Sequence, residues 1–104
     1  MTLITDEQLN LLPKFYDTEK LSNKETKVPL KFFVPIIGFR WYAVEYCPND
    51  RIFFGFANLN DDQCAELGYF SLDELESLSS PRVQIDSSWN PNTTLEEVIS
   101  FKKR

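Results

Sequence analysis

The feature that most constrains the fold is a series of three aromatic and β-branched segments separated by turns of four residues. The segments cover residues 28–34, 39–46 and 51–57, and the turns between them, 35–38 and 47–50, contain proline, glycine, asparagine and aspartate. Aromatic and β-branched residues favour strands, whereas these turn residues favour a tight reversal of the chain. Because connections this short join antiparallel neighbours, the sequence predicts an antiparallel β-meander.

Three short helices are expected to flank the meander, because three segments carry the signature of a capped helix start. In this capping box a Ser or Thr hydroxyl, and a Glu or Gln side chain three residues later, bind backbone N–H groups of the first turn. The signature occurs at Thr5 with Gln8, at Ser71 with Glu74, and at Thr93 or Thr94 with Glu96 or Glu97. A fourth strand is predicted at 64–70 and a short edge strand at 82–86. The predicted fold class is therefore α+β, an antiparallel β-meander of about four strands with three short flanking helices.

Residues 1–104 are predicted to form a single domain, because a chain of this length is too short for two cores of ordinary size. The hydrophobic fraction of 42% is far above that of disordered chains, so most of the chain is expected to fold. Residues 16–27 differ, since they are polar and lysine-rich and lack a helical apolar stripe. We expect them to form a connecting arm of low order.

Charge and hydropathy indicate the cellular compartment of the chain and whether it binds nucleic acid or membranes. The net charge of −5 and the isoelectric point near 4.6 argue against broad attraction to nucleic acid or to anionic lipid. No apolar run of membrane-spanning length occurs, and Asp6 and Glu7 stand where a secretory signal would carry basic residues. The two cysteines, Cys47 and Cys64, lack the dense spacing of a secreted disulfide framework and are expected to be reduced. We therefore expect a cytoplasmic protein that does not bind membranes.

The absence of histidine limits the chemistry open to this chain. Histidine is the usual general base, the usual partner of a catalytic Ser or Cys, and the commonest transition-metal ligand. Glu45 and Glu66 could share acid and base work, but the expected register places them on opposite faces of the sheet. Cys47 lies in a turn without an activating histidine, and the three glycines form no phosphate-binding loop. The prediction is a protein without catalytic residues, cofactor or metal site.

Three sequence blocks resemble, in order and spacing, those of a known family. They are Trp41-Tyr42-Ala43-Val44-Glu45, Phe53-Phe54-Gly55 and Glu66-Leu67-Gly68-Tyr69-Phe70-Ser71-Leu72, with Leu11-Leu12-Pro13 upstream. Over roughly residues 5–80 the chain is thereby similar to an uncharacterised family of small bacterial proteins, a domain of unknown function that plasmids and other mobile elements often encode. The resemblance implies a bacterial, plasmid or phage setting and supplies no catalytic residues. From Val83 onward the chain matches no pattern of this kind.

If the four-residue turns close simple hairpins, Val34 pairs with Phe39 and Tyr46 pairs with Arg51. One face of the sheet then forms the core, with Phe54 and Phe56 among its residues. It includes Glu45 near its end, where the carboxylate could reach solvent or cap a loop. The opposite face is basic and aromatic and includes Phe53. Glu66 would lie on it beside Gly55, in one row with Lys31 and Tyr42, and Gly55 would leave a shallow floor in this row. The candidate binding residues of this face are Lys31, Arg40, Tyr42, Tyr46, Arg51 and Glu66. The alternative is that a helix covers the face and that these residues only pack and pair.

The function predicted from this face is a non-enzymatic protein-interaction module, since aromatic residues and arginine anchor protein interfaces. One alternative is an anti-defence inhibitor that mimics nucleic acid, or blocks a defence nuclease, through an acidic surface. Its residues would be Asp61, Asp62, Asp73, Glu74 and Glu76, which lack the regular spacing of a calcium-binding loop. Another alternative is single-stranded nucleic-acid binding on the aromatic face, which the net charge disfavours. The sequence leaves the oligomeric state open, although an exposed aromatic face would favour a symmetric dimer.

Overall fold

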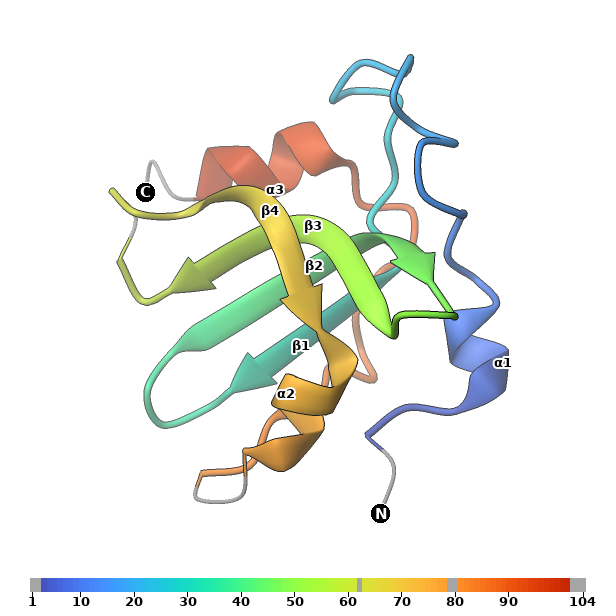
Figure 1. Ribbon diagram of the computed structural model, residues 1–104. Helices are drawn as coiled ribbons and strands as arrows, with labels where there is room; N and C mark the ends of the chain where they lie inside the picture. Colours follow the sequence, from blue (N-terminus) through green and yellow to red (C-terminus); the bar gives the residue numbers. More distant parts are fainter. Residues whose placement is uncertain (1–2, 62, 79–80, 102–104) are drawn as a thin grey trace.

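The computed structural model describes residues 3–61, 63–78 and 81–101, and within them a five-stranded antiparallel sheet runs through the centre of the molecule (Figure 1). The strands lie in the order β4-β3-β2-β1-β5. Their bounds are Leu30–Val34 (β1), Phe39–Cys47 (β2), Ile52–Leu59 (β3), Glu66–Ser71 (β4) and Gln84–Ile85 (β5). The predicted meander is confirmed for β1 to β4, and β5 forms within the predicted edge segment and pairs with β1. The α+β class is confirmed, with one strand more than the four of the meander.

The described residues also contain three short helices, α1 (Asp6–Leu9), α2 (Leu72–Ser77) and α3 (Leu95–Phe101). Thr5 and Gln8 form the predicted capping box, in which each side chain accepts a hydrogen bond from the backbone N–H of the other residue. The Ser71 hydroxyl caps α2. At α3 the reciprocal bonds join Thr94 and Glu97, which selects this pair among the predicted alternatives. None of the described helices has the length and hydropathy that crossing a membrane requires.

Each face of the sheet carries its own hydrophobic cluster. On one face, which we call the α2 face, Leu72 and Leu75 of α2 belong to a cluster with Phe32, Trp41 and Phe53 of the sheet. Residues Ile4 and Leu12, on either side of α1, join the same cluster. On the opposite face, the α3 face, Leu95 and Val98 of α3 pack with Val28, Tyr42, Val44 and Phe56. The sheet therefore has two covered faces rather than one core face and one exposed face, and the alternative of a covering helix is confirmed for Tyr42.

The first hairpin has the predicted register, with Val34 opposite Phe39 and Lys31 opposite Tyr42. The predicted register of the second hairpin is wrong, because Tyr46 lies opposite Phe53 instead of Arg51. The pairing also shifts by one residue between Ala43 and Glu45, so that Val44 forms a β-bulge. A bulge adds one residue to its strand, and one extra residue turns all later side chains to the opposite face.

The bulge explains why several residues lie on the face opposite to the predicted one. Tyr46 and Phe53 pack on the α2 face, although the simple hairpin placed them beside Tyr42. Phe54 and Phe56 contact the cluster of the α3 face instead of belonging to the predicted core. In β4, Glu66 lies opposite Ala57, and the partner of Gly55 is Gly68. The predicted row that joined Lys31, Tyr42, Gly55 and Glu66 therefore does not exist.

Candidate functional site

The two tyrosines of the predicted binding surface are buried on different faces of the sheet. Tyr42 is 3% exposed on the α3 face, where its ring centre lies 5.5 Å from that of Trp89. Tyr46 is 6% exposed on the α2 face, with its ring centre 4.9 Å from that of Phe53. Burial raises the pKa of both phenols, because the ionised form loses the most solvation. The aromatic platform predicted for a protein partner or for stacked bases is therefore not exposed.

Lys31 lies on the α3 face within a cage of aromatic neighbours. Its ammonium is 5.7 Å from the ring centre of Phe33, 5.8 Å from that of Tyr42 and 5.6 Å from that of Trp89. The same ammonium lies 3.6 Å from the carboxylate of Asp86. Partial burial acts to raise the pKa of Asp86, but hydrogen bonds from the following turn and the lysine charge outweigh it and lower this pKa. Lys31 thus finds its partners within the chain.

The other three candidates are also spread over the molecule. Arg51, in the turn between β2 and β3, binds the carboxylates of Asp73 at 2.7 Å and Glu76 at 2.8 Å. Arg40 is half-buried on β2, and its buried Nε has no hydrogen-bond partner within the described residues. Glu66 is exposed at the start of β4. The six predicted residues therefore do not form one site.

The acidic residues of the alternative hypothesis do not form one surface either. Asp73, Glu74 and Glu76 belong to α2, which follows β4, whereas Asp61 lies in the loop that precedes β4 (Figure 1). Two of the three α2 carboxylates are paired with Arg51, and Asp62 lies outside the described residues. In the described part of the chain, no group of three or more histidine, cysteine, aspartate or glutamate residues is placed to hold a metal ion.

A groove of about 330 Å³ opens on the α3 face, between the sheet and the arm, which in the structure comprises residues 15–27. Residues of three neighbouring strands form its floor: Val44 and Glu45 of β2, Phe54 of β3, and Leu67 and Tyr69 of β4. The arm lines one side, and Leu95 of α3 lines the groove as well. Its volume is at the lower end of the range for sites that bind small ligands or single side chains.

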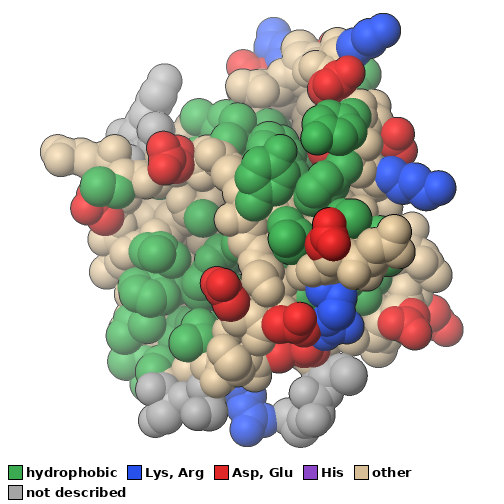
Figure 2. Space-filling model, viewed as in Figure 1, with side chains coloured by type: hydrophobic (Ala, Val, Ile, Leu, Met, Phe, Trp, Pro, Cys, Tyr) green, Lys and Arg blue, Asp and Glu red, His purple; other side chains and the backbone are tan. Residues whose placement is uncertain are grey.

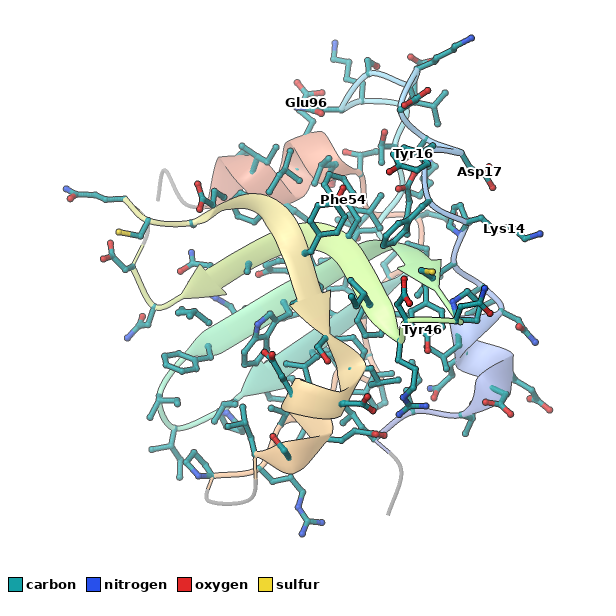
Figure 3. All side chains as sticks on the ribbon, viewed as in Figure 1. Lys14, Tyr16, Asp17, Tyr46, Phe54 and Glu96 are labelled. Carbon is teal, nitrogen blue, oxygen red and sulfur yellow. The ribbon has the colours of Figure 1, made fainter. Side chains whose placement is uncertain are left out.

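Aromatic rings connect the arm to β4 beside the groove. The ring centre of Phe15 lies 5.6 Å from that of Tyr69 and 6.2 Å from that of Tyr16, and Tyr69 lies 5.4 Å from Phe54. Tyr16 is 68% exposed and Tyr69 is 63% exposed. Figure 2 shows hydrophobic side chains gathered between β4 and the arm, and Figure 3 shows Tyr16 and Phe54 on the same side of the sheet. The groove and these rings form one exposed apolar surface.

Glu45 fastens the arm to the sheet. One carboxylate oxygen accepts a hydrogen bond from the Tyr16 N–H at 3.2 Å, and the other accepts bonds from the N–H and hydroxyl of Thr18 at 2.9 and 2.5 Å. Glu45 itself is 5% exposed. Tyr16 has a φ of 72°, which is uncommon for a bulky side chain and which these contacts hold in place. Glu45 thus caps a loop, and the arm, although it lacks helix, is tied to the sheet.

The groove ends at an open edge of the sheet. β4 is the outermost strand on this side, and no described strand pairs with its outer edge. In the middle of β4, Gly68 has free space around it, since a Cβ built there would meet no other atom within 4 Å. A strand edge of this kind presents unpaired N–H and C=O groups that can bind another extended chain.

Sequence reasoning missed this groove because its parts come from distant segments whose faces depend on the bulge. The simple hairpin assigned Phe54 to the core and treated the arm as loosely ordered. One available signal was the pair Phe15-Tyr16, which places two aromatic side chains next to a polar, lysine-rich stretch. Such residues are expected to pack against something, and here they pack against Tyr69 and the groove.

Comparisons with known proteins identify the family of the chain. A family model described as "Protein of unknown function (DUF2958)" matches residues 3–103, so the chain belongs to this family. This confirms the resemblance to an uncharacterised family and extends it to the segment from Val83 onward. A search of curated proteins and a search of solved structures each found no significant match.

Proposed function

We propose that this member of the DUF2958 family is a non-enzymatic interaction module that binds an extended segment of a partner protein along β4. Side chains of the bound segment would enter the groove between the arm and the sheet. The observation that carries this proposal is an exposed apolar groove that opens directly onto the unpaired edge of β4. The two features together give an extended chain both backbone partners and a pocket for alternate side chains.

Exposed aromatic and aliphatic side chains support a protein partner. Tyr16, Tyr69 and Leu67 are 68%, 63% and 41% exposed, and all three line the groove. Contiguous apolar surface of this kind is rare unless it serves an interface, and tyrosine is enriched among interface residues. The strained backbone at Tyr16 agrees with this, because strain that the surrounding structure maintains is often found at binding sites.

A non-catalytic role is supported by the state of the one carboxylate on the groove floor. Glu45 already holds three hydrogen bonds from the arm, which leaves little freedom for proton transfer to a substrate. The chain also contains no histidine that could act as a general base. The setting that we propose is the bacterial cytoplasm, in association with a mobile element, because the sequence blocks resemble proteins encoded there.

Selection from a library of displayed random peptides tests the proposed function. We expect recovered peptides to bind the wild type and to lose at least about tenfold in affinity, about 1.4 kcal/mol, when Leu67→Ser and Tyr69→Ser are combined. Ile36→Ser is the matched control, since Ile36 is an exposed apolar residue, 86% exposed, in the turn between β1 and β2. Equal binding by the wild type and the groove variant would contradict the proposal.

Methylation of the peptide backbone tests whether binding uses the strand edge. Only alternate N–H groups of an added strand point toward the sheet, so N-methyl groups at one set of alternate positions should abolish binding. N-methyl groups at the other set should leave it intact. A selected peptide that tolerates, or fails with, both sets of methyl groups would show that it does not pair with β4.

A further inference from the structure

Glu45 is a buried carboxylate without a cationic partner in the described part of the chain. Its three hydrogen bonds all come from neutral donors, the Tyr16 N–H and the N–H and hydroxyl of Thr18. Within the described residues, no lysine or arginine forms an ion pair with it. Yet its side chain is almost fully buried, in a residue that is 5% exposed. Buried charges in proteins are usually paired, because their desolvation is costly.

Two other charged residues at the sheet follow that rule. Lys31, which is partly buried, pairs with Asp86 and lies against three aromatic rings. Arg51 is bound by two carboxylates of α2. Two described ionic groups of the sheet that are at least half-buried, Arg40 and Glu45, form no ion pair within the described residues. Of these two, Glu45 lies on the floor of the groove.

The charges and rings that line the groove are complementary to a cation. Its charged lining residues are Glu45 and Glu19, both acidic. Its aromatic lining residues are Phe15, Tyr16, Phe54 and Tyr69. The faces of such rings attract cations, and a planar guanidinium stacks on them while its long aliphatic stem packs against apolar surface. An arginine side chain fits both the acidic and the aromatic residues of this lining.

We propose that the groove takes an arginine side chain from the bound partner segment, with its guanidinium directed to Glu45 and Glu19. This inference rests on the proposed function, since an extended segment paired with β4 would direct alternate side chains toward the α3 face. The guanidinium would supply the missing countercharge of Glu45. The four aromatic side chains would enclose its stem and plane.

A pair of small probes tests the charge requirement on the unmodified protein. N-acetylarginine methylamide carries the guanidinium, and N-acetylcitrulline methylamide is its neutral counterpart of nearly the same shape. Backbone amide resonances are followed by NMR while each probe is added. We expect the arginine probe to shift the resonances of Thr18, Phe54 and Tyr69 saturably, and the citrulline probe to bind at least about tenfold more weakly.

Variants locate the effect without disturbing the arm. Glu19→Gln removes the exposed acidic residue of the lining, and we expect it to weaken the arginine probe but not the citrulline probe. Glu96→Gln is the control, because Glu96 is an exposed acidic residue of α3 that does not line the groove. Equal binding of the two probes, or shifts confined to residues outside the groove, would overturn the inference.

The peptide selection separates this inference from the proposed function. Groove-dependent peptides that carry arginine at one fixed position would support both. Groove-dependent peptides without any preference for a basic residue would overturn the arginine inference and leave the interaction module standing. Saturable binding of the arginine probe, combined with a failure to recover any groove-dependent peptide, would mean that a free small cation is the occupant and would overturn both.

Discussion

At the scale of single residues, Gly55 and Gly68 lie opposite each other in the sheet but face very different surroundings. A Cβ built at Gly55 would lie 2.0 Å from the carbonyl oxygen of Tyr42, because the bulge at Val44 brings the backbone of β2 close to β3. A Cβ at Gly68 would meet nothing within 4 Å. The sequence assigned Gly55 to the floor of an open surface, whereas the structure uses it to let two strands approach each other.

We predict that Gly55→Ala destabilises the fold by about 3 kcal/mol or more, since a backbone atom cannot give way as a flexible side chain can. Gly68→Ala is the matched control in the facing strand and should change the free energy of unfolding by less than about 0.5 kcal/mol. Urea unfolding followed by circular dichroism measures both. Comparable stability of the two variants would show that the approach of β2 to Gly55 does not exclude a side chain at this position.

At the scale of elements, the turns and caps could be predicted from the sequence, but the bulge could not. Each capping box depends on two residues at fixed spacing, so Thr5 with Gln8 and the cap at Ser71 were visible locally. A bulge at Val44 has no such signature, because Ala43, Val44 and Glu45 all suit a regular strand. Its consequence is nonetheless large. Tyr46 and Phe53 lie on the same face, as predicted. That face is the α2 face, however, and not the face of Tyr42, with which the simple hairpin grouped them.

The arm is the element whose behaviour depends most on one side chain, Glu45. We predict that Glu45→Gln raises the hydrogen-exchange rates of the Tyr16 and Thr18 amides by about tenfold or more. The amide side chain keeps one acceptor oxygen but loses the charge, and a hydrogen bond to a charged group contributes about 1.5–3 kcal/mol. Glu19→Gln, in the same arm, should leave these rates unchanged. Unaltered exchange in Glu45→Gln would show that the arm is held by its apolar contacts alone.

At the scale of the whole molecule, the fold class was predictable because the alternation of strands and turns is strong, whereas the groove was not. The groove can be predicted only when the residues of the α3 face are known. That face is covered by the C-terminal segment, which contains none of the sequence blocks on which the family resemblance rests. Leu95 and Val98 pack there against Tyr42 and Phe56. Trp89 adds a hydrogen bond from its ring N–H to the carbonyl of Val28, at 2.7 Å. The sequence predicts a helix in this segment, but it does not reveal which residues of the sheet the helix covers.

The last prediction concerns the C-terminal segment that covers the α3 face. A chain that ends at residue 88 should lose cooperative unfolding, because it lacks Trp89, Leu95 and Val98 and exposes Tyr42 and Val44. Each large buried side chain contributes about 1.5–3 kcal/mol, and a small domain has only about 5–15 kcal/mol in total. Trp89→Phe provides the mild counterpart, since it keeps a ring and removes the bond to Val28, at a cost of about 1 kcal/mol. Urea titration with near-ultraviolet circular dichroism distinguishes the cases. A shortened chain that still unfolds cooperatively would show that β1 to β4 hold their faces without α3, and the position of the groove would then no longer depend on the C-terminal segment.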